Sequence, residues 1–263
     1  MGAEFIDYII ADRVVLPEES QQYYSEVPLF AGLLPGQRRY ATDRDNRSDP
    51  RGSGLPENAF VFCCFNASNK IEPNTFAAWM RILQQVPESV MWLLDKDERT
   101  RTHLCQAAQQ QAVDPRRLIF APRLPKPEHL ERHRLADLFL DTFICNAHTT
   151  ASDALWAGLP VLTLCGTAFP ARVCASLLFA IGLSELVTGQ AEDFINKAVH
   201  WASRGDRLAE LRSRLDNNRR NFPLFDTERH TRHLERAYEL MWTAECRGDG
   251  HVPSISVSPL EKS

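Results

Sequence analysis

Short apolar runs alternate with helical patterns through the central part of the chain. From residue 58 each apolar run is bounded by turn residues, and apolar positions between the runs recur at helical spacing. The predicted strands are 59–65, 90–94, 118–120, 138–140 and 161–164, and the predicted helices between them are 75–85, 98–111, 127–134 and 150–157. Strands alternating with helices predict βαβ units, and therefore an α/β fold with a parallel sheet and helices on both faces.

The flanking segments have different patterns. Residues 5–10 form a strand-like apolar run, and the polar stretch that follows, rich in proline and arginine, has too little apolar content to fold alone. After Pro170 the pattern is helical, with predicted helices at 170–181, 191–204, 207–220 and 226–246. Residues 247–263 are predicted to be a disordered tail.

Composition narrows the class of protein. The 263 residues are 44% apolar and 24% charged, as in a soluble globular protein, and the net charge of −4 favours neither nucleic acid nor a membrane surface as a partner. Seven scattered cysteines without a CxxC pair indicate neither a zinc site nor a disulfide framework. No apolar run reaches transmembrane length and no signal peptide is evident, so we expect a cytoplasmic protein.

A ligand of such a sheet is expected at the carboxyl ends of the strands, because loops that follow parallel strands gather at one edge. The candidate loops are 66–70, 122–129, 145–153 and 165–172. No G-x-G-x-x-G motif and no P-loop is present, which argues against dinucleotide oxidoreductases and NTPases.

The most informative loop leads into the helix predicted at 150–157. Thr150, with Asp153 three residues later, predicts an N-cap and a first-turn acid. The N-terminus of such a helix attracts phosphate, to which His148, Thr149 and Thr150 can add side-chain donors. An ordinary capped helix explains the same residues equally well.

Three further residues could contact a ligand. Lys70 follows the first strand and could place an ammonium group on a phosphate, although a solvated turn lysine is the commoner case. Lys126 and His129 begin a helix after a strand, where they could contact a base. His129 and His133 are spaced i, i+4 like a metal pair, but no third ligand is evident.

Four segments together resemble the O-linked N-acetylglucosamine (O-GlcNAc) transferase family. They are FNASNKIEP from Phe65, FAPRLPKPEHLERHRLADLFLDT from Phe120, CNAHTTASDALWAGLPVLT from Cys145 and TLCGTAFPARVCAS from Thr163. They occur in the family's order, and with the opening and closing stretches they cover most of residues 1–246. The resemblance implies the Rossmann-like C-terminal lobe of a GT-B glycosyltransferase, preceded by the end of the N-terminal lobe (1–30) and an interlobe linker (31–57), with the C-terminal lobe and closing helix at 58–246.

The resemblance also implies roles for individual residues. Lys70 would contact the phosphates of UDP, and Lys126 and His129 the uracil end. The residues that would line the rest of the donor pocket are Cys145, His148, Thr149, Thr150 and Asp153. Ala67 and Cys165 depart from the family, which has Gln and Pro there. Cys145 and Arg172 could equally be structural, as a packed thiol and a salt-bridging residue.

By resemblance the chain would bind UDP-GlcNAc, without a metal or other cofactor, for transfer of N-acetylglucosamine to Ser or Thr hydroxyls of an acceptor protein. The family's catalytic histidines lie upstream of what Met1 begins, in a lobe that usually follows tetratricopeptide repeats. We therefore expect no transfer by this chain alone. The alternatives are a non-catalytic nucleotide-sugar-binding module and a degenerate structural remnant.

Overall fold

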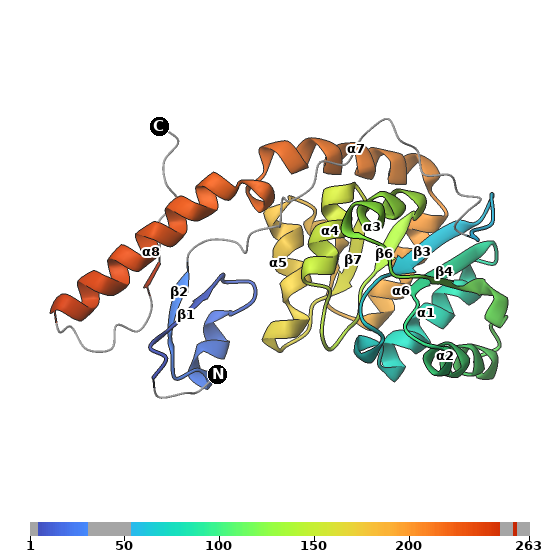
Figure 1. Cartoon of the computed structure of the whole chain (residues 1–263), viewed down its shortest axis with the longest axis horizontal. Coiled ribbons are helices and arrows are strands. Elements are labelled where there is room, and N and C mark those ends of the chain that lie inside the picture. The colour runs from blue at the N-terminus through green and yellow to red at the C-terminus, as the bar shows by residue number, and fades with distance from the viewer. Residues whose placement is uncertain (1–4, 31–53, 248–254, 257–263) are drawn as a thin grey trace.

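The computed structural model describes residues 5–30, 54–247 and 255–256, and its largest part is a six-stranded parallel sheet between two layers of helices (Figure 1). The strands are β3 (Phe60–Cys64), β4 (Ser89–Leu94), β5 (Leu118–Ala121), β6 (Leu138–Leu140), β7 (Val161–Leu164) and β8 (Val187–Thr188). Their order in the sheet is β5-β4-β3-β6-β7-β8. The predicted α/β class is therefore confirmed, and the strands are nearly continuous apolar runs because helices cover both faces.

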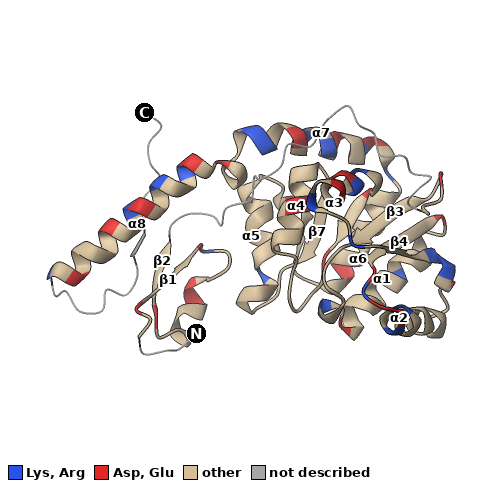
Figure 2. Ribbon diagram, in the orientation of Figure 1, with Lys and Arg blue, Asp and Glu red and all other residues tan. Residues whose placement is uncertain are grey.

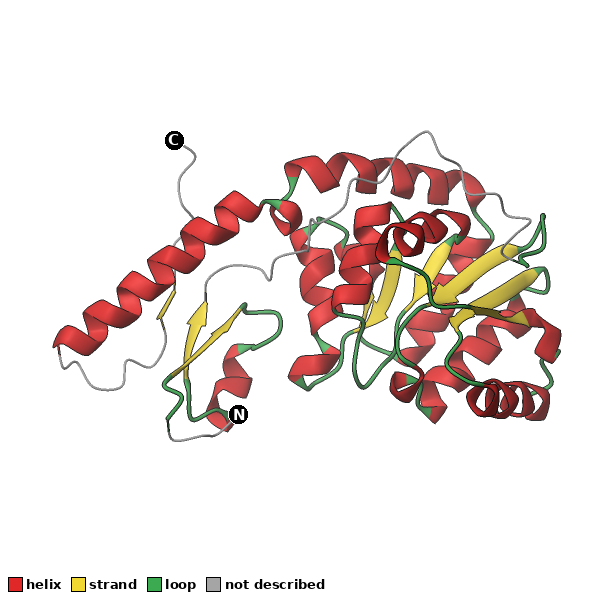
Figure 3. Ribbon diagram, in the orientation of Figure 1, coloured by secondary structure: helices red, strands yellow, loops and turns green. Residues whose placement is uncertain are grey.

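Helices α1 (Pro73–Gln85), α2 (Glu98–Gln110) and α6 (Ala191–Ala202) lie on one face of the sheet, and α3 (Lys126–Arg132), α4 (Thr149–Ala157) and α5 (Val173–Ala180) on the other (Figure 3). Helix α1 packs against α6, and α4 packs against both α3 and α5. Most predicted helix and strand bounds agree with the structure within a few residues. The predicted helix 170–181 instead begins with a 3-10 turn, Phe169–Ala171, before α5. The edge strand β8 was not predicted.

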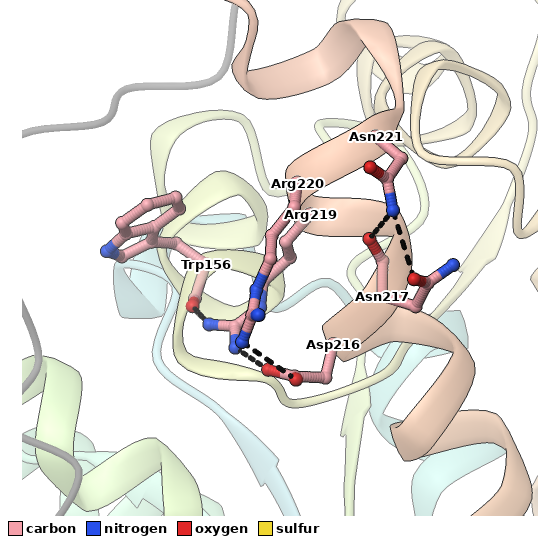
Figure 4. A network of polar contacts seen from close by, with 6 residues as sticks. All are labelled: Trp156, Asp216, Asn217, Arg219, Arg220 and Asn221. Atoms are coloured by element: carbon pink, nitrogen blue, oxygen red, sulfur yellow. Dashed lines mark hydrogen bonds and ion pairs between the residues drawn. The ribbon is translucent and has the colours of Figure 1, made fainter.

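Helix α7 (Gly205–Asn221) crosses the amino ends of the strands, opposite the candidate loops. Arg212 contacts Asp137, the residue immediately before β6, at 3.4 Å. Arg219 donates to the backbone carbonyl of Trp156 near the end of α4 and forms an ion pair with Asp216 (Figure 4). These bonds satisfy a carbonyl that the helix leaves without an internal partner and fix the far end of α4.

The N-terminal segment forms a second, smaller sheet. Strands β1 (Tyr8–Ala11) and β2 (Val27–Phe30) pair in parallel, and β9 (Ile255–Ser256) pairs with β2. The expected disordered tail is therefore wrong for these two residues, because β2 offers them a free backbone edge; the rest of 247–263, Arg247 apart, lies outside the described residues. The predicted linker 31–57 also lies outside them, except for 54–57.

The long helix α8 (Thr227–Arg247) packs on this smaller sheet through Ala237, Leu240 and Met241. Acidic and basic residues alternate along α7 and α8, whereas α5 contains none (Figure 2). No helix among the described residues is long and apolar enough to cross a membrane.

Candidate functional site

The sheet changes direction between β3 and β6, the two strands at its centre. From β3 the chain proceeds outward to β4 and β5, and from β6 it proceeds to β7 and β8 in the opposite direction. The carboxyl ends of β3 and β6 are therefore the point of the sheet at which open α/β folds bind ligands. Two of the predicted candidate loops, 66–70 and 145–153, follow β3 and β6 and flank this point.

Lys70 joins these two loops. It ends a 3-10 turn, Ser68–Lys70, and its Nζ atom donates a hydrogen bond of 2.7 Å to the backbone oxygen of Asn146. The side chain is half-buried, so the ammonium group is held over the loop that leads into α4. The sequence left open a solvated turn lysine; in the structure Lys70 instead contacts a loop that lies 76 residues further along the chain.

Helix α4 begins at Thr149, and His148 occupies the N-cap position without a side-chain cap bond. The predicted Thr150 cap is wrong, because Thr150 already lies in the first turn. The first backbone N–H groups of the helix have no acceptor within it and lie at the carboxyl edge of the sheet, because α4 follows β6. His148 is tethered through its ring Nε2, which lies 3.1 Å from the oxygen of Pro170. Cys145 is half-buried, and its carbonyl accepts a bond of 2.6 Å from Thr142 Oγ1.

Lys126 and Asp153 form an ion pair between α3 and α4. The Asp153 side chain is only 8% exposed, and burial raises the pKa of this carboxyl while Lys126 lowers it. The structure thus brings together Lys126, which the resemblance assigned to the uracil end, and Asp153, which it assigned to the rest of the donor pocket. The pair also fixes the start of α3 against α4.

His129 lies on α3 against a small aromatic group. Its ring packs edge-on against Phe65 and His133, with centroid distances of 5.5 and 4.7 Å. The Nε atom of Arg132 lies 2.9 Å from His129 Nδ1. A guanidinium group only donates hydrogen bonds, so Nδ1 must accept and the ring proton is on Nε2. Burial, and then Arg132, lower the pKa of His129 to about 4, which keeps the ring neutral at physiological pH.

Comparison with known proteins identifies the family. Residues 47–234 match the sequence model of the family described as "Glycosyl transferase family 41". The chain belongs to glycosyl transferase family 41. This membership confirms the family suggested by the four segments.

Relatives in this family are much longer than this chain. A protein of Arabidopsis thaliana named as a probable UDP-N-acetylglucosamine–peptide N-acetylglucosaminyltransferase is 37% identical over 254 residues, which are 94% of this chain and 26% of that protein. The UDP-N-acetylglucosamine–peptide N-acetylglucosaminyltransferase of Caenorhabditis elegans is 37% identical over 72% of this chain and 16% of its own length. A mutant of the Thermobaculum terrenum O-GlcNAc transferase has a TM-score of 0.78 at 30% identity, covering 93% of this chain and 46% of that one.

The candidate site contains a polar network that the sequence patterns did not predict. Asp141 is fully buried at the end of β6 and bonds to Asn66 and Thr163. The sequence signal was present, since Asn66 and Asp141 each follow an apolar run directly. Their contact could be inferred only once β3 and β6 were known to be neighbours.

Arg172 binds backbone carbonyls and takes part in no salt bridge with the described residues. Its Nε atom donates to the oxygen of Val14 at 2.6 Å, and its NH1 atom donates to the oxygen of Gly166 at 2.8 Å. Both partners are backbone carbonyls. The salt-bridge interpretation of Arg172 is therefore wrong, and the residue connects the N-terminal segment to the loop after β7.

The positions of His129 and His133 are explained by packing and a backbone hydrogen bond. The two rings pack against each other, and His133 Nδ1 bonds to the backbone oxygen of His129 at 2.7 Å. Within the described ranges, no group of three or more His, Cys, Asp and Glu residues is placed to hold a metal ion.

The lowered pKa values of His129 and His133 predict that the folded chain loses stability in acid. Burial lowers the pKa of both in the folded chain, to about 4 for His129 from an ordinary value of 6.5. The unfolded chain therefore takes up protons at a higher pH than the folded chain does, and the free energy of unfolding is expected to fall as the pH falls from about 6.5 toward 4. Urea unfolding at pH 7 and pH 5 measures this fall.

The variant His133→Phe keeps a ring against Phe65 and removes one titrating group, so its free energy of unfolding should depend less on pH. His103→Phe is the control, because His103 is exposed on α2 and its variant should keep the pH dependence of the wild type. An equal pH dependence in wild type and His133→Phe would contradict the assignment.

Proposed function

We propose that this chain is the donor-binding lobe of a protein O-GlcNAc transferase. In this proposal it binds UDP-GlcNAc for transfer of N-acetylglucosamine to Ser or Thr hydroxyls of an acceptor protein. The observation that carries the proposal is the contact of Lys70 with the loop before α4, at the point where the sheet changes direction. Family membership and the names of the relatives support this choice of donor.

The diphosphate is proposed to lie between Lys70 and the N-terminus of α4. The ammonium group and the free N–H groups of Thr149 and Thr150 supply positive potential where negative charge develops on the leaving UDP. We therefore propose that no metal or other cofactor is required. His148 and Cys145 flank this position from the same loop.

The nucleoside is proposed to lie toward α3. His129 is neutral, and the flat face of a neutral ring can pack against a base. Lys126 would approach the uracil and Asp153 the ribose, from either side of their ion pair. A ribose hydroxyl can donate to the Asp153 carboxylate while Lys126 remains bonded to it, because a carboxylate accepts several hydrogen bonds.

The chain spans about a quarter of the length of the Arabidopsis relative, so the whole transferase activity is a proposal about a larger assembly. No catalytic residue is proposed among residues 1–263; in the family this role belongs to histidines of the N-terminal lobe. A partner lobe with tetratricopeptide repeats would then supply the catalytic and acceptor-binding half. The seven cysteines are all free thiols, which supports a reducing compartment such as the cytoplasm.

Calorimetric titration of UDP into the purified chain tests the proposal. Binding in the micromolar to millimolar range is expected, with GDP at least tenfold weaker because the proposed contacts of Lys126 and His129 are to a uracil ring. Incubation with UDP-GlcNAc and a serine-containing peptide should give no transfer. A folded chain that binds neither nucleotide would instead support the degenerate remnant. Transfer to the peptide would show that the catalytic group lies within this chain.

A further inference from the structure

Asp141 is the most heavily hydrogen-bonded carboxylate at the carboxyl edge of the sheet. It follows β6 directly and is 0% exposed. Its Oδ1 atom accepts from the backbone N–H groups of Thr142 at 2.8 Å and Ala147 at 2.6 Å, and from Asn66 Nδ2 at 3.3 Å. Its Oδ2 atom accepts from Thr163 Oγ1 at 2.7 Å. Four donors from three separate segments therefore converge on one side chain.

These partners determine the shape of the loop before α4. Thr142 and Ala147 lie near the two ends of the loop, so one carboxylate oxygen closes it. Asn66 connects the same oxygen to the loop after β3, and also bonds to Thr142 Oγ1 at 2.9 Å. Asn146 Nδ2 adds a bond of 2.7 Å to the oxygen of Thr142. The loop thus depends on a central acceptor as well as on the apolar packing of Phe143 and Ala147.

The chemistry of this acceptor is unusual for a packing residue. Its described hydrogen-bond donors are neutral, and burial raises the pKa of the Asp141 carboxyl. A buried carboxylate costs free energy unless its hydrogen bonds are satisfied, so an apolar residue would serve packing alone at a lower cost. A satisfied buried network of this kind rigidifies the segments that it joins.

We propose that Asp141 is a positioning residue for the donor diphosphate. By closing the loop from Thr142 to Ala147, it presents the oxygen of Asn146 to Lys70 and fixes where α4 begins. Asp141 itself does not touch the donor. The proposal rests on the proposed function for the ligand, but the effect on the loop can be measured without any ligand.

Two substitutions separate the hydrogen bonds of Asp141 from its charge. Asp141→Asn keeps an oxygen that can accept from the three N–H donors, and its amide group can donate to Thr163 Oγ1. Asp141→Ala removes every bond and leaves the backbone N–H groups of Thr142 and Ala147 without their acceptor. If Asp141 positions the loop through its hydrogen bonds, Asp141→Asn should keep the UDP affinity and the slow loop exchange that Asp141→Ala loses.

The experiment combines UDP titration with amide hydrogen exchange of residues 142–150. Asp141→Ala is expected to weaken UDP binding at least 30-fold and to speed exchange in this loop at least tenfold, whereas Asp141→Asn should stay within threefold of the wild type in both. Leu215→Ala is the control, because Leu215 is fully buried on α7, at the other end of the strands. It should lower the melting temperature without changing either readout.

If Asp141→Ala does not fold, the variant Thr163→Val tests the same proposal. It removes only the bond to Oδ2, and a loss of affinity of about fivefold is expected. Wild-type affinity in folded Asp141→Ala would overturn the proposal, as would equal losses in the alanine and asparagine variants or a matching loss in Leu215→Ala. Absence of UDP binding in the wild type would reject the proposed function. In that case, amide exchange of residues 142–150 that is faster in Asp141→Ala but not in Asp141→Asn would still support the effect of Asp141 on the loop. Exchange that is unchanged in Asp141→Ala would reject this effect.

Discussion

Replacing Lys70 by methionine is expected to weaken UDP binding by about 30-fold. Methionine keeps the length of the side chain and removes the ammonium group, so the variant reports on charge and hydrogen bonding. A charge-assisted hydrogen bond contributes about 2 kcal/mol, which corresponds to this change in affinity. Titration calorimetry of UDP into wild type and variant, at one salt concentration, measures the difference.

Lys197→Met is the matched control for Lys70→Met. Lys197 is also half-buried and also donates to backbone oxygens, those of Glu185 and Val187, at 2.5 and 3.2 Å. It lies on α6, away from the loops after β3 and β6, so its variant should bind UDP like the wild type. Equal affinities for wild type and Lys70→Met would place the diphosphate elsewhere.

Arg117→Ala is expected to lower the free energy of unfolding by about 2 to 3 kcal/mol. The Arg117 guanidinium donates to the backbone oxygens of Leu83, Val86 and Ser89 at 2.7 to 2.8 Å, and to Ser89 Oγ at 3.0 Å. The first two oxygens belong to the end of α1, where carbonyls lack helical partners. For a chain of this size, we expect the melting temperature to fall by about 5 to 10 °C.

The neighbouring residue supplies the control for Arg117→Ala. Arg116 is exposed and pairs only with Asp114 within the described structure, and an exposed ion pair contributes little to stability. The free energy of unfolding of Arg116→Ala should therefore lie within about 0.5 kcal/mol of the wild-type value. Similar losses in both variants would show that the carbonyl bonds of Arg117 are not responsible. Urea unfolding of the three proteins provides the comparison.

The central sheet could be predicted because its strands are apolar on both faces. The runs 138–140 and 161–164 coincide with β6 and β7, since both lie between turns and are buried completely or nearly so. Strand β8 contains only Val187 and Thr188, which is too short for any periodic pattern. Strand β2 contains Pro28, and it pairs with β1 in a register that joins Tyr8 to Val27, a contact between distant positions that no local pattern indicates.

The candidate site was predictable in its loops but not in its internal contacts. Lys70 and the loop before α4 follow strands, and parallel strands end at one edge. That β3 and β6 are adjacent depends on the order of the strands, because the strands β4 and β5 and the helices α1, α2 and α3 lie between them in sequence. The bond from Lys70 to Asn146 and the role of Asp141 follow from this adjacency. Thr150 was misplaced as a cap because the cap geometry begins at His148, which a capping pattern does not favour.

Arg172 links two parts of the chain that are more than 150 residues apart in sequence. One guanidinium group holds the oxygens of Val14 and Gly166, and Asp12 accepts a further bond from Ser176 on α5. If the N-terminal segment rotates as a rigid body, Arg172 must either release one carbonyl or pull the loop after β7 with it. Arg172 therefore couples the position of the N-terminal segment to that of the loop after β7, which lies at the edge where the donor is proposed to bind.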